Sequence, residues 1–465
     1  MTMIKRIAIF ITSLALFIET IDTTILNLAV PAMAQSFNTE PLNLKMALIS
    51  YCLSISIFVP ISGWIADKYG AKRIFIYSLC MFTLSSVFCG YATNLFELTI
   101  FRALQGVGGA MMLPVGRLII SRVFDKHEII GAFSHLAIFA ALGTLLGPLL
   151  GGLITQYFSW PWIFWINIPV AILLIILACR FPAFFPEQEV SPLDKLGFLL
   201  FGGSLACLTL GLSALSEDTL SVIQALLIII MAFGLMALYR VHSANIQYPI
   251  VNTKLFQIRS FRVSMIGSLA GRLAFGSIPF LLPIILQVGL HLSPKTSGLL
   301  LAPWAIGIML AKPLVFNLVQ LLGYRRLLIF NTIAVAFSTG GFITISAHTP
   351  FVLIGLLTFI YGFLISIQYG GMNSLTYADI SNEDLGHATS MLGTMQQLTL
   401  SISVAFCSVV IKIFSSIAPT TLEINMVAFH ACFLIMGLMI LCSTLIFMEL
   451  NSEDGRQLYR TTTQS

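Results

Sequence analysis

Apolar residues along this chain form long continuous blocks, separated by short polar connections. The blocks show neither the stripes of amphipathic helices nor the alternation of half-buried strands. Blocks of about 20 residues match the thickness of a bilayer core when they are helical, whereas membrane strands are shorter and alternate. The pattern predicts fourteen membrane-spanning helices, with approximate limits at residues 7–30, 44–66, 74–93, 96–119, 131–154, 163–180, 196–215, 220–239, 262–287, 296–319, 327–346, 351–374, 388–415 and 424–448.

The composition favours a membrane protein over a soluble one. Of the 465 residues, 58% are hydrophobic and 9% are charged, while soluble domains carry about 25% charged residues. The net charge of +5 comes from cations scattered among short connections, with no basic tract that would bind nucleic acid. The eight cysteines lie inside apolar blocks without CxxC spacing, so we expect buried thiols rather than a disulfide framework.

The amino terminus has the appearance of a secretory leader. Lys5 and Arg6 precede an apolar run, and residues 32–34 have the composition of a cleavage site. The run is too long for a leader, however, and Glu19 and Asp22 interrupt it. We therefore expect a first transmembrane helix here.

The distribution of cations predicts the orientation. If the amino terminus is cytoplasmic, 17 of the 24 Lys and Arg residues fall in inner segments, and only Lys45 and Lys295 fall in outer loops. The positive-inside rule then places both termini in the cytoplasm, with an even number of spans. We expect a multi-pass protein of the bacterial inner (plasma) membrane, with a loose polar tail after Met448.

Two loops suggest an internal repeat. Residues 68–73 and 321–326 both place a glycine before paired cations. Aligning them superposes spans one to six on spans nine to fourteen, as in transporters with duplicated halves. The predicted domains are an N-terminal six-helix bundle at 1–182, two inserted helices at 183–258, a C-terminal six-helix bundle at 259–448 and a cytoplasmic tail at 449–465.

The loop after span two carries a recognisable signature. Residues 63–73 read GWIADKYGAKR and resemble the signature loop of the major facilitator superfamily, although Ala71 replaces a usual basic residue. Gly63 would allow close packing at the helix end, Gly70 would allow a left-handed turn, and Asp67 could pair with cations. The resemblance implies a conformational gating loop, whereas the plainer alternative is a solvated loop. Its candidate residues are Gly63, Asp67, Gly70 and Arg73.

Span four contains Arg102 within the run RALQGVGGA, which resembles the fourth-helix motif of the same family. A bare arginine inside a membrane span is costly, so it should face a partner or a cavity. Gly106 and the glycines at 108–109 would allow a neighbouring helix to approach closely. The alternative role for Arg102 is purely structural, in tying two helices together.

Span five contains GTLLGPLLGG at residues 143–152. Its glycines recur every four residues, so they share one helix face and form a packing strip, and the proline adds a kink. The run resembles the antiporter motif of the family's exporters, which implies efflux over uptake. Generic helix packing is the alternative. The candidate residues are Gly143, Gly147, Pro148, Gly151 and Gly152.

The first predicted span contains two acidic residues within its apolar run. Residues 22–31 resemble the first-helix motif of the fourteen-span drug:proton antiporters. Glu19 and Asp22 are three residues apart and lie on one helix face, and two close carboxylates in a low dielectric are expected to share protons. An ion pair or hydrogen bond to Arg102 or to the backbone is the alternative. The proton-coupling candidates are Asp22, Glu19 and Arg102.

The resemblance covers nearly the whole chain. Residues 160–169 resemble the entry to span six in the fourteen-span group and place an aromatic belt at the outer interface. The chain is most similar to the EmrB/QacA-like branch and, within it, to MdtD-like multidrug transporters. This implies an all-α membrane protein with the major facilitator fold, in which two pseudo-symmetric six-helix bundles are joined by two extra helices. It also implies proton-driven export of small organic molecules by alternating access, without a cofactor.

Cations inside the spans open an alternative. Arg272 lies ten residues into span nine, about 15 Å along the helix and close to the midplane. We find no acid within spans nine to fourteen to neutralise it, so the anion it needs would be a span-one acid, backbone carbonyls or the substrate itself. The last case predicts an exporter of an anionic metabolite, such as a polycarboxylate or a metal chelate. The substrate-cavity candidates are Arg117, Arg272 and Lys312.

Other function classes lack their signatures. No His, Cys, Asp and Glu residues stand at metal-ligand spacing, and no P-loop is present. A membrane enzyme would need a nucleophile with a base, or a metal site, and the sequence shows neither. We therefore expect a transporter whose partners are a small molecule, protons and the lipid bilayer. Nucleic acid is not expected, and accessory export proteins are left open.

Overall fold

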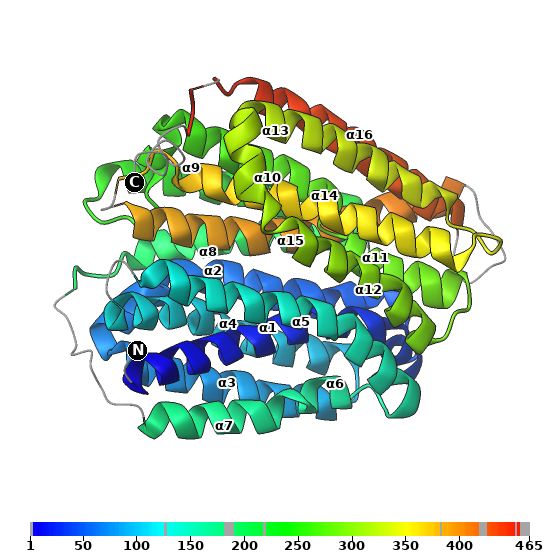
Figure 1. Cartoon of the computed structure of the whole chain (residues 1–465), viewed down its shortest axis with the longest axis horizontal. Coiled ribbons are helices and arrows are strands. Elements are labelled where there is room, and N and C mark those ends of the chain that lie inside the picture. Colours follow the sequence, from blue (N-terminus) through cyan, green and yellow to red (C-terminus); the bar gives the residue numbers. More distant parts are fainter. Residues whose placement is uncertain are drawn as a thin grey trace. The chain divides into compact units, whose positions relative to one another are not determined.

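The computed structural model describes residues 3–124, 128–180, 190–216, 220–381, 384–417, 426–451 and 453–455. Within these ranges the chain forms helices and short connections, without a β-strand (Figure 1). The all-α architecture expected from the continuous apolar blocks is therefore confirmed.

The helices follow one another along the chain with few residues between them. The first group comprises α1 (Met3–Ser36), η1 (Pro41–Leu44), α2 (Lys45–Tyr69), α3 (Ala71–Tyr91), α4 (Leu95–Val123), α5 (Ile129–Tyr157), α6 (Trp162–Trp165), α7 (Asn167–Arg180), α8 (Lys195–Leu215) and α9 (Val222–Asn245). The second comprises η2 (Thr253–Gln257), α10 (Arg259–Phe275), α11 (Ile278–Ile284), η3 (Ile285–Gly289), α12 (Pro294–Ala311), α13 (Leu314–Gly341), η4 (Phe342–Thr344), α14 (Phe351–Tyr377), α15 (Leu385–Ile417) and α16 (Met426–Met448).

Thirteen segments of the described chain are long and apolar enough to cross a membrane. They correspond to the predicted spans except the tenth, whose limits need correction. Span ten was expected to be continuous over 296–319, but α12 ends at Ala311, and Lys312 and Pro313 interrupt the helix before α13 begins. A proline lacks the amide hydrogen that a helix interior requires, so the sequence carried this signal.

Span nine is also interrupted. It was expected as one helix over 262–287, whereas the structure has α10, the short α11 and a π-helical turn, η3. The break falls at Gly276 and Ser277, where a Cβ on Gly276 would lie 2.6 Å from the carbonyl oxygen of Arg272. Prolines within α11 cannot continue the hydrogen-bond ladder of α10.

The turn glycines of the predicted repeat behave alike. Gly70 has φ 87° and Gly323 has φ 70°, a backbone region that glycine adopts without steric penalty. Gly70 separates α2 from α3, and Gly323 marks the kink within α13. The repeated glycine turns are therefore confirmed, while the proposed domain limits stay predictions.

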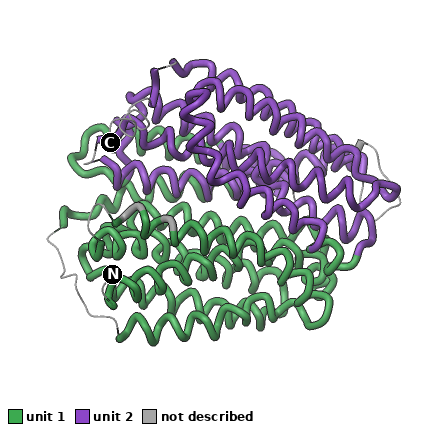
Figure 2. Tube along the Cα trace, in the orientation of Figure 1, with its two compact units in different colours: residues 1–209, 230–250, 293–298 green, residues 210–229, 251–292, 299–465 purple. Residues whose placement is uncertain are grey.

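The chain divides into two compact units, coloured in Figure 2. Unit 1 comprises residues 1–209, 230–250 and 293–298, and unit 2 comprises 210–229, 251–292 and 299–465. Within unit 1, α1 packs along α5, while α4 packs between α2 and α3. Within unit 2, α13 packs on α14 and α16, and α10 packs on α15 and α16.

Candidate functional site

The carboxylate of Asp22 lies at the centre of a buried network in unit 1. Its Oδ2 accepts a hydrogen bond from Arg102 Nη1 at 2.5 Å. Its Oδ1 accepts from Gln105 Nε2 at 2.9 Å and from Asn167 Nδ2 at 3.1 Å. The network therefore joins α1, α4 and α7 through one carboxylate. The structure contains the ion pair between Asp22 and Arg102 that the sequence left as one alternative, while a role in proton coupling stays a prediction.

Arg102 is held on several sides. Its side chain is fully buried, and its Nη1 also donates to Gln105 Oε1 at 2.6 Å. Its Nε donates to the carbonyl of Ala47 at 3.3 Å, and its guanidinium lies 4.2 Å from the ring centroid of Tyr51. Breaking such a buried pair by removing one partner costs about 3–5 kcal/mol, because a charge is left without its counter-ion.

Glycines bring the helices of this network close together. A Cβ on Gly106 would lie 2.5 Å from the carbonyl oxygen of Tyr51 on α2. On α5, a Cβ on Gly147 would lie 1.9 Å from Thr24 Oγ1 on α1, and one on Gly143 would lie 2.9 Å from the Cβ of Thr20. The predicted packing strip therefore faces α1, the helix that carries Asp22.

The rest of the antiporter motif is also tightly packed. A Cβ on Gly151 would lie 2.9 Å from the carbonyl oxygen of Ile25, so the strip continues along α1. Gly152 faces another segment of unit 1, where a Cβ would lie 2.5 Å from the carbonyl oxygen of Pro294. Pro148 lies inside α5. The packing is as predicted, while a role in antiport stays a prediction.

Glu19 lies next to this network without joining it. Its side chain is 7% exposed, and its Oε2 has no hydrogen-bond partner among the described residues. The charged groups that act on it are Arg117 and Asp22. Helix α1 therefore carries two buried acids in different situations, one ion-paired and one with an unsatisfied carboxylate oxygen.

The predicted gating loop contains an ion pair. Arg122, near the end of α4, donates to the carboxylate of Asp67 near the end of α2. Arg73 is exposed in the first turn of α3. Gly63 does not serve close packing as expected, because a Cβ there would meet no described atom within 4 Å. The pair of Asp67 and Arg122 links α2 to α4, and its gating role stays a prediction.

Arg272 has a different environment in unit 2. Its side chain is 8% exposed, its Nε donates to Ser268 Oγ at 2.7 Å, and its Nη2 donates to Asn373 Oδ1 at 3.2 Å. Gln396 Nε2 donates to the same amide oxygen at 3.1 Å, and the guanidinium lies 3.8 Å from the ring centroid of Tyr369. No ion pair joins Arg272 to an acid in the described part of the chain.

The other two cavity candidates lie at exposed positions. Arg117 is exposed on α4, within reach of the charge on Glu19. Lys312 is exposed in the break between α12 and α13. Of the three candidates, Arg272 is the one buried in a polar setting.

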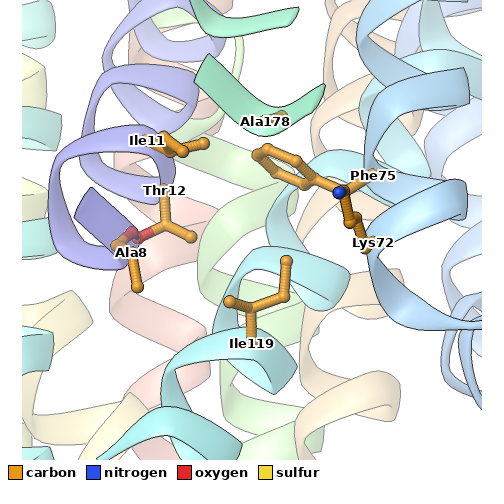
Figure 3. A pocket seen from close by; sticks show the side chains of 7 residues that line it. All are labelled: Ala8, Ile11, Thr12, Lys72, Phe75, Ile119 and Ala178. Atoms are coloured by element: carbon orange, nitrogen blue, oxygen red, sulfur yellow. Dashed lines mark hydrogen bonds between the residues drawn. The ribbon is translucent and has the colours of Figure 1, made fainter. Parts of the chain in front are cut away.

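The structure also has a hollow in unit 1 that is separate from these residues. Figure 3 shows it surrounded mainly by apolar side chains. Lys72, at its edge, donates to the carbonyl of Cys179 at 3.0 Å. None of the proton-coupling candidates lines it, so we do not assign it to the site. The lining residues are Ala8, Ile11, Thr12, Lys72, Phe75, Ile119 and Ala178.

Sequence reasoning missed four members of the buried network. Gln105 lies three residues after Arg102 and therefore on the same helix face, so it could have been found. Asn167, Ser86 and Tyr51 come from other helices and are neutral, so their cost inside a membrane gives no comparable signal. Ser86 Oγ accepts from Gln105 Nε2 at 2.9 Å, which extends the network to α3.

Comparisons with known proteins agree with the resemblance found in the sequence. The model of the Major Facilitator Superfamily matches residues 12–404 and 264–460. Proteins named "Putative multidrug resistance protein MdtD" from Shigella flexneri serotype 5b and Escherichia coli O139:H28 are 36% identical over 411 residues, covering 88% of this chain and 87% of theirs.

Solved structures of transporters share the fold at low sequence identity. The D-xylose-proton symporter has a TM-score of 0.70 at 14% identity, covering 96% of this chain and 98% of its own. A mutant of the nucleoside transporter NupG has a TM-score of 0.65 at 14% identity, covering 96% and 99%. Together with the family match, these likenesses confirm the expected fold and exclude the enzyme alternative. The chain belongs to the major facilitator superfamily and is a multi-pass membrane transporter.

Proposed function

We propose that the protein exports small organic molecules of the multidrug type in exchange for protons, by alternating access. We place it in the bacterial inner membrane with both termini in the cytoplasm, following the cation bias of its loops. Its MdtD relatives are named for multidrug resistance, which supports the substrate class. The observation that carries proton coupling is the wholly buried pair of Asp22 and Arg102.

The proposed coupling step is protonation of Asp22. A neutral carboxyl group would no longer attract the guanidinium of Arg102, which would keep Gln105 Oε1 as an acceptor. Because the carboxylate also binds Asn167, its neutralisation would weaken the contacts between α1, α4 and α7 at once. Glu19 lies one turn away on the same helix and would relay the proton.

The test is transport by proteoliposomes with an imposed pH gradient, using cationic, neutral and anionic substrates. Asp22→Asn keeps the size of the side chain but removes its titratable charge, so we expect export to become independent of the gradient. Glu19→Gln should reduce the coupled rate less. Asp454→Asn is the matched control, because Asp454 pairs with the exposed Arg259. Normal gradient-driven export by the Asp22 variant would refute the proposed step.

Export of an anionic metabolite, such as a polycarboxylate or a metal chelate, is the second candidate. The observation that favours it is Arg272, a nearly buried cation whose described partners are a hydroxyl, an amide and an aromatic ring. A buried cation needs a compensating anion, and a transported carboxylate would provide one. This candidate keeps the same transport cycle and changes only the class of substrate.

The two candidates differ in how they respond to Arg272→Gln. If the substrate is an anion, this variant should lose anion export while any cation export persists. Arg259→Gln, at an exposed arginine of the same unit, controls for the loss of a positive charge. Equal transport of every substrate by the Arg272 variant and the parent would remove anion export from consideration.

A further inference from the structure

Three sulfur atoms converge inside unit 2. Cys407 on α15 and Cys432 on α16 both face Met436, which is also on α16. The Cys407 Sγ lies 3.6 Å from the Met436 Sδ, and the Cys432 Sγ lies 3.7 Å from it. The two thiols also interact with each other. All three side chains are wholly buried.

A hydroxyl group completes this sulfur cluster. Ser277, in the break between α10 and α11, places its Oγ 2.8 Å from the Cys407 Sγ. The same oxygen lies 4.0 Å from the Met436 Sδ. Ser277 is fully buried as well. The hydroxyl can therefore donate a hydrogen bond to the Cys407 sulfur, in a setting without bulk water.

The distances from the Met436 sulfur to the two cysteine sulfurs are close to those between ligands of a trigonal metal site. A metal ion about 2.3 Å from each of three sulfurs in one plane holds neighbouring sulfurs about 4.0 Å apart. The observed 3.6 and 3.7 Å fall a few tenths of an ångström short of that spacing. Side-chain shifts of a few tenths of an ångström would therefore bring these sulfurs to the spacing of such a site.

We propose that Cys407, Cys432 and Met436 bind a soft monovalent metal ion, Cu(I) or Ag(I). Thiolate and thioether ligands select soft ions, and this cluster offers two thiols and one thioether. Zn²⁺ prefers four ligands in a tetrahedron, drawn from thiolate, imidazole and carboxylate. The described part of the chain has no group of three His, Cys, Asp or Glu residues that could hold a metal. The sulfur cluster differs from such a group because its third ligand is Met436.

The charge balance favours a monovalent ion. Binding of one Cu⁺ or Ag⁺ with release of one thiol proton leaves the site neutral, which suits an apolar interior. The proton leaves Cys407, because the Ser277 hydroxyl can then donate to the resulting thiolate. No oxidation is involved, since the ion enters and leaves in the same oxidation state.

The bound ion would link two helices of unit 2. It would bridge α15 to α16 directly, beside the break between α10 and α11. At that break a Cβ on Gly276 would already lie 3.2 Å from Ser403 of α15. Metal binding should therefore raise the thermal stability of the protein as well as occupy the site.

The test uses the purified full-length protein in lipid nanodiscs under anaerobic conditions. Cu(I) is titrated in competition with bicinchoninate, and we expect one ion per chain to resist the chelator. Cys407→Ser and Cys432→Ser should each weaken binding at least tenfold. Cys442→Ser, an exposed cysteine on the same helix α16, is the matched control and should bind as the parent does.

A conservative variant separates binding from folding. Met436→Leu keeps the apolar volume, and X-ray absorption should show three sulfur ligands in the parent and two in this variant. Ag(I) should raise the melting temperature of the parent by several degrees and that of the Cys407 and Cys432 variants by less. The proposal is overturned if the parent yields its Cu(I) to the chelator, if both cysteine variants bind like the parent, or if Zn²⁺ is held as tightly.

Discussion

Two buried arginines, one in each unit, share several features but differ in one partner that matters for proton chemistry. Arg102 and Arg272 both stack on a tyrosine ring, at 4.2 and 3.8 Å from its centroid, and both bind neutral side chains. Arg102 also has the carboxylate of Asp22 at 2.5 Å, whereas the corresponding oxygen next to Arg272 belongs to the amide of Asn373. A carboxylate can be neutralised by a proton and an amide cannot, so only the first arginine has a partner that a proton can remove.

The largest effect is expected on stability, from removing each arginine in turn. Arg102→Ala would leave the buried carboxylate of Asp22 without its counter-ion and should lower stability by about 3–5 kcal/mol. Among the described residues, Arg272→Ala would leave only neutral partners, and it should cost about 1–3 kcal/mol from lost hydrogen bonds and the lost aromatic contact. Thermal unfolding in the same lipid would measure both. Equal losses would mean that the carboxylate makes no difference.

A smaller effect is expected from moving the helix that carries the acid. Gly147→Ala would bring a Cβ to 1.9 Å from Thr24 Oγ1, so α1 must shift, at a cost of about 1–3 kcal/mol. The shift should weaken coupled export through Asp22 while leaving the surroundings of Arg272 unchanged. Gly131→Ala on the same helix is the control, because a Cβ there meets no described atom within 4 Å. Identical unfolding temperatures for the two variants would contradict the packing argument.

The smallest expected effect on stability comes from making the two arginines alike. Asn373→Asp would place a carboxylate beside Arg272, where attraction and desolvation should nearly cancel, within about 1 kcal/mol. Its effect on transport should be larger if Arg272 binds an anionic substrate, because the new carboxylate would pair with the guanidinium in place of the substrate. Competition assays with anionic substrates would measure this. Undiminished anion export by a stable Asn373→Asp variant would argue against a substrate role for Arg272.

Much of the fold was predictable because membrane thickness fixes the length of an apolar block. The breaks within spans nine and ten were harder to predict. Pro313 signals one of them directly. The break at Gly276 and Ser277 depends on how closely Arg272 and Ser403 approach that glycine. The pattern of residues along the chain does not reveal such contacts. Helix length is therefore a property of the sequence, whereas continuity also depends on neighbours.

The candidate site was predictable in part for a similar reason. Asp22 and Arg102 were found because charges inside a membrane are expensive and must find each other or a ligand. Asn167 was missed because a neutral amide carries no such penalty, and its position against Asp22 depends on how α7 packs on α1. The sulfur cluster was missed because Cys407 and Cys432 lie on different helices, so their spacing along the chain has no meaning for a metal.

The length of α1 gives the packing strip a mechanical consequence. The helix runs from Met3 to Ser36, and its contact with Gly147 falls at Thr24, about 32 Å from the amino-terminal end at 1.5 Å per residue. A tilt of about 5° around that fulcrum would move the end of the helix by about 3 Å. Because Asp22 lies two residues from Thr24, a small displacement at the carboxylate would be amplified along this lever into a larger movement at the amino-terminal end of α1.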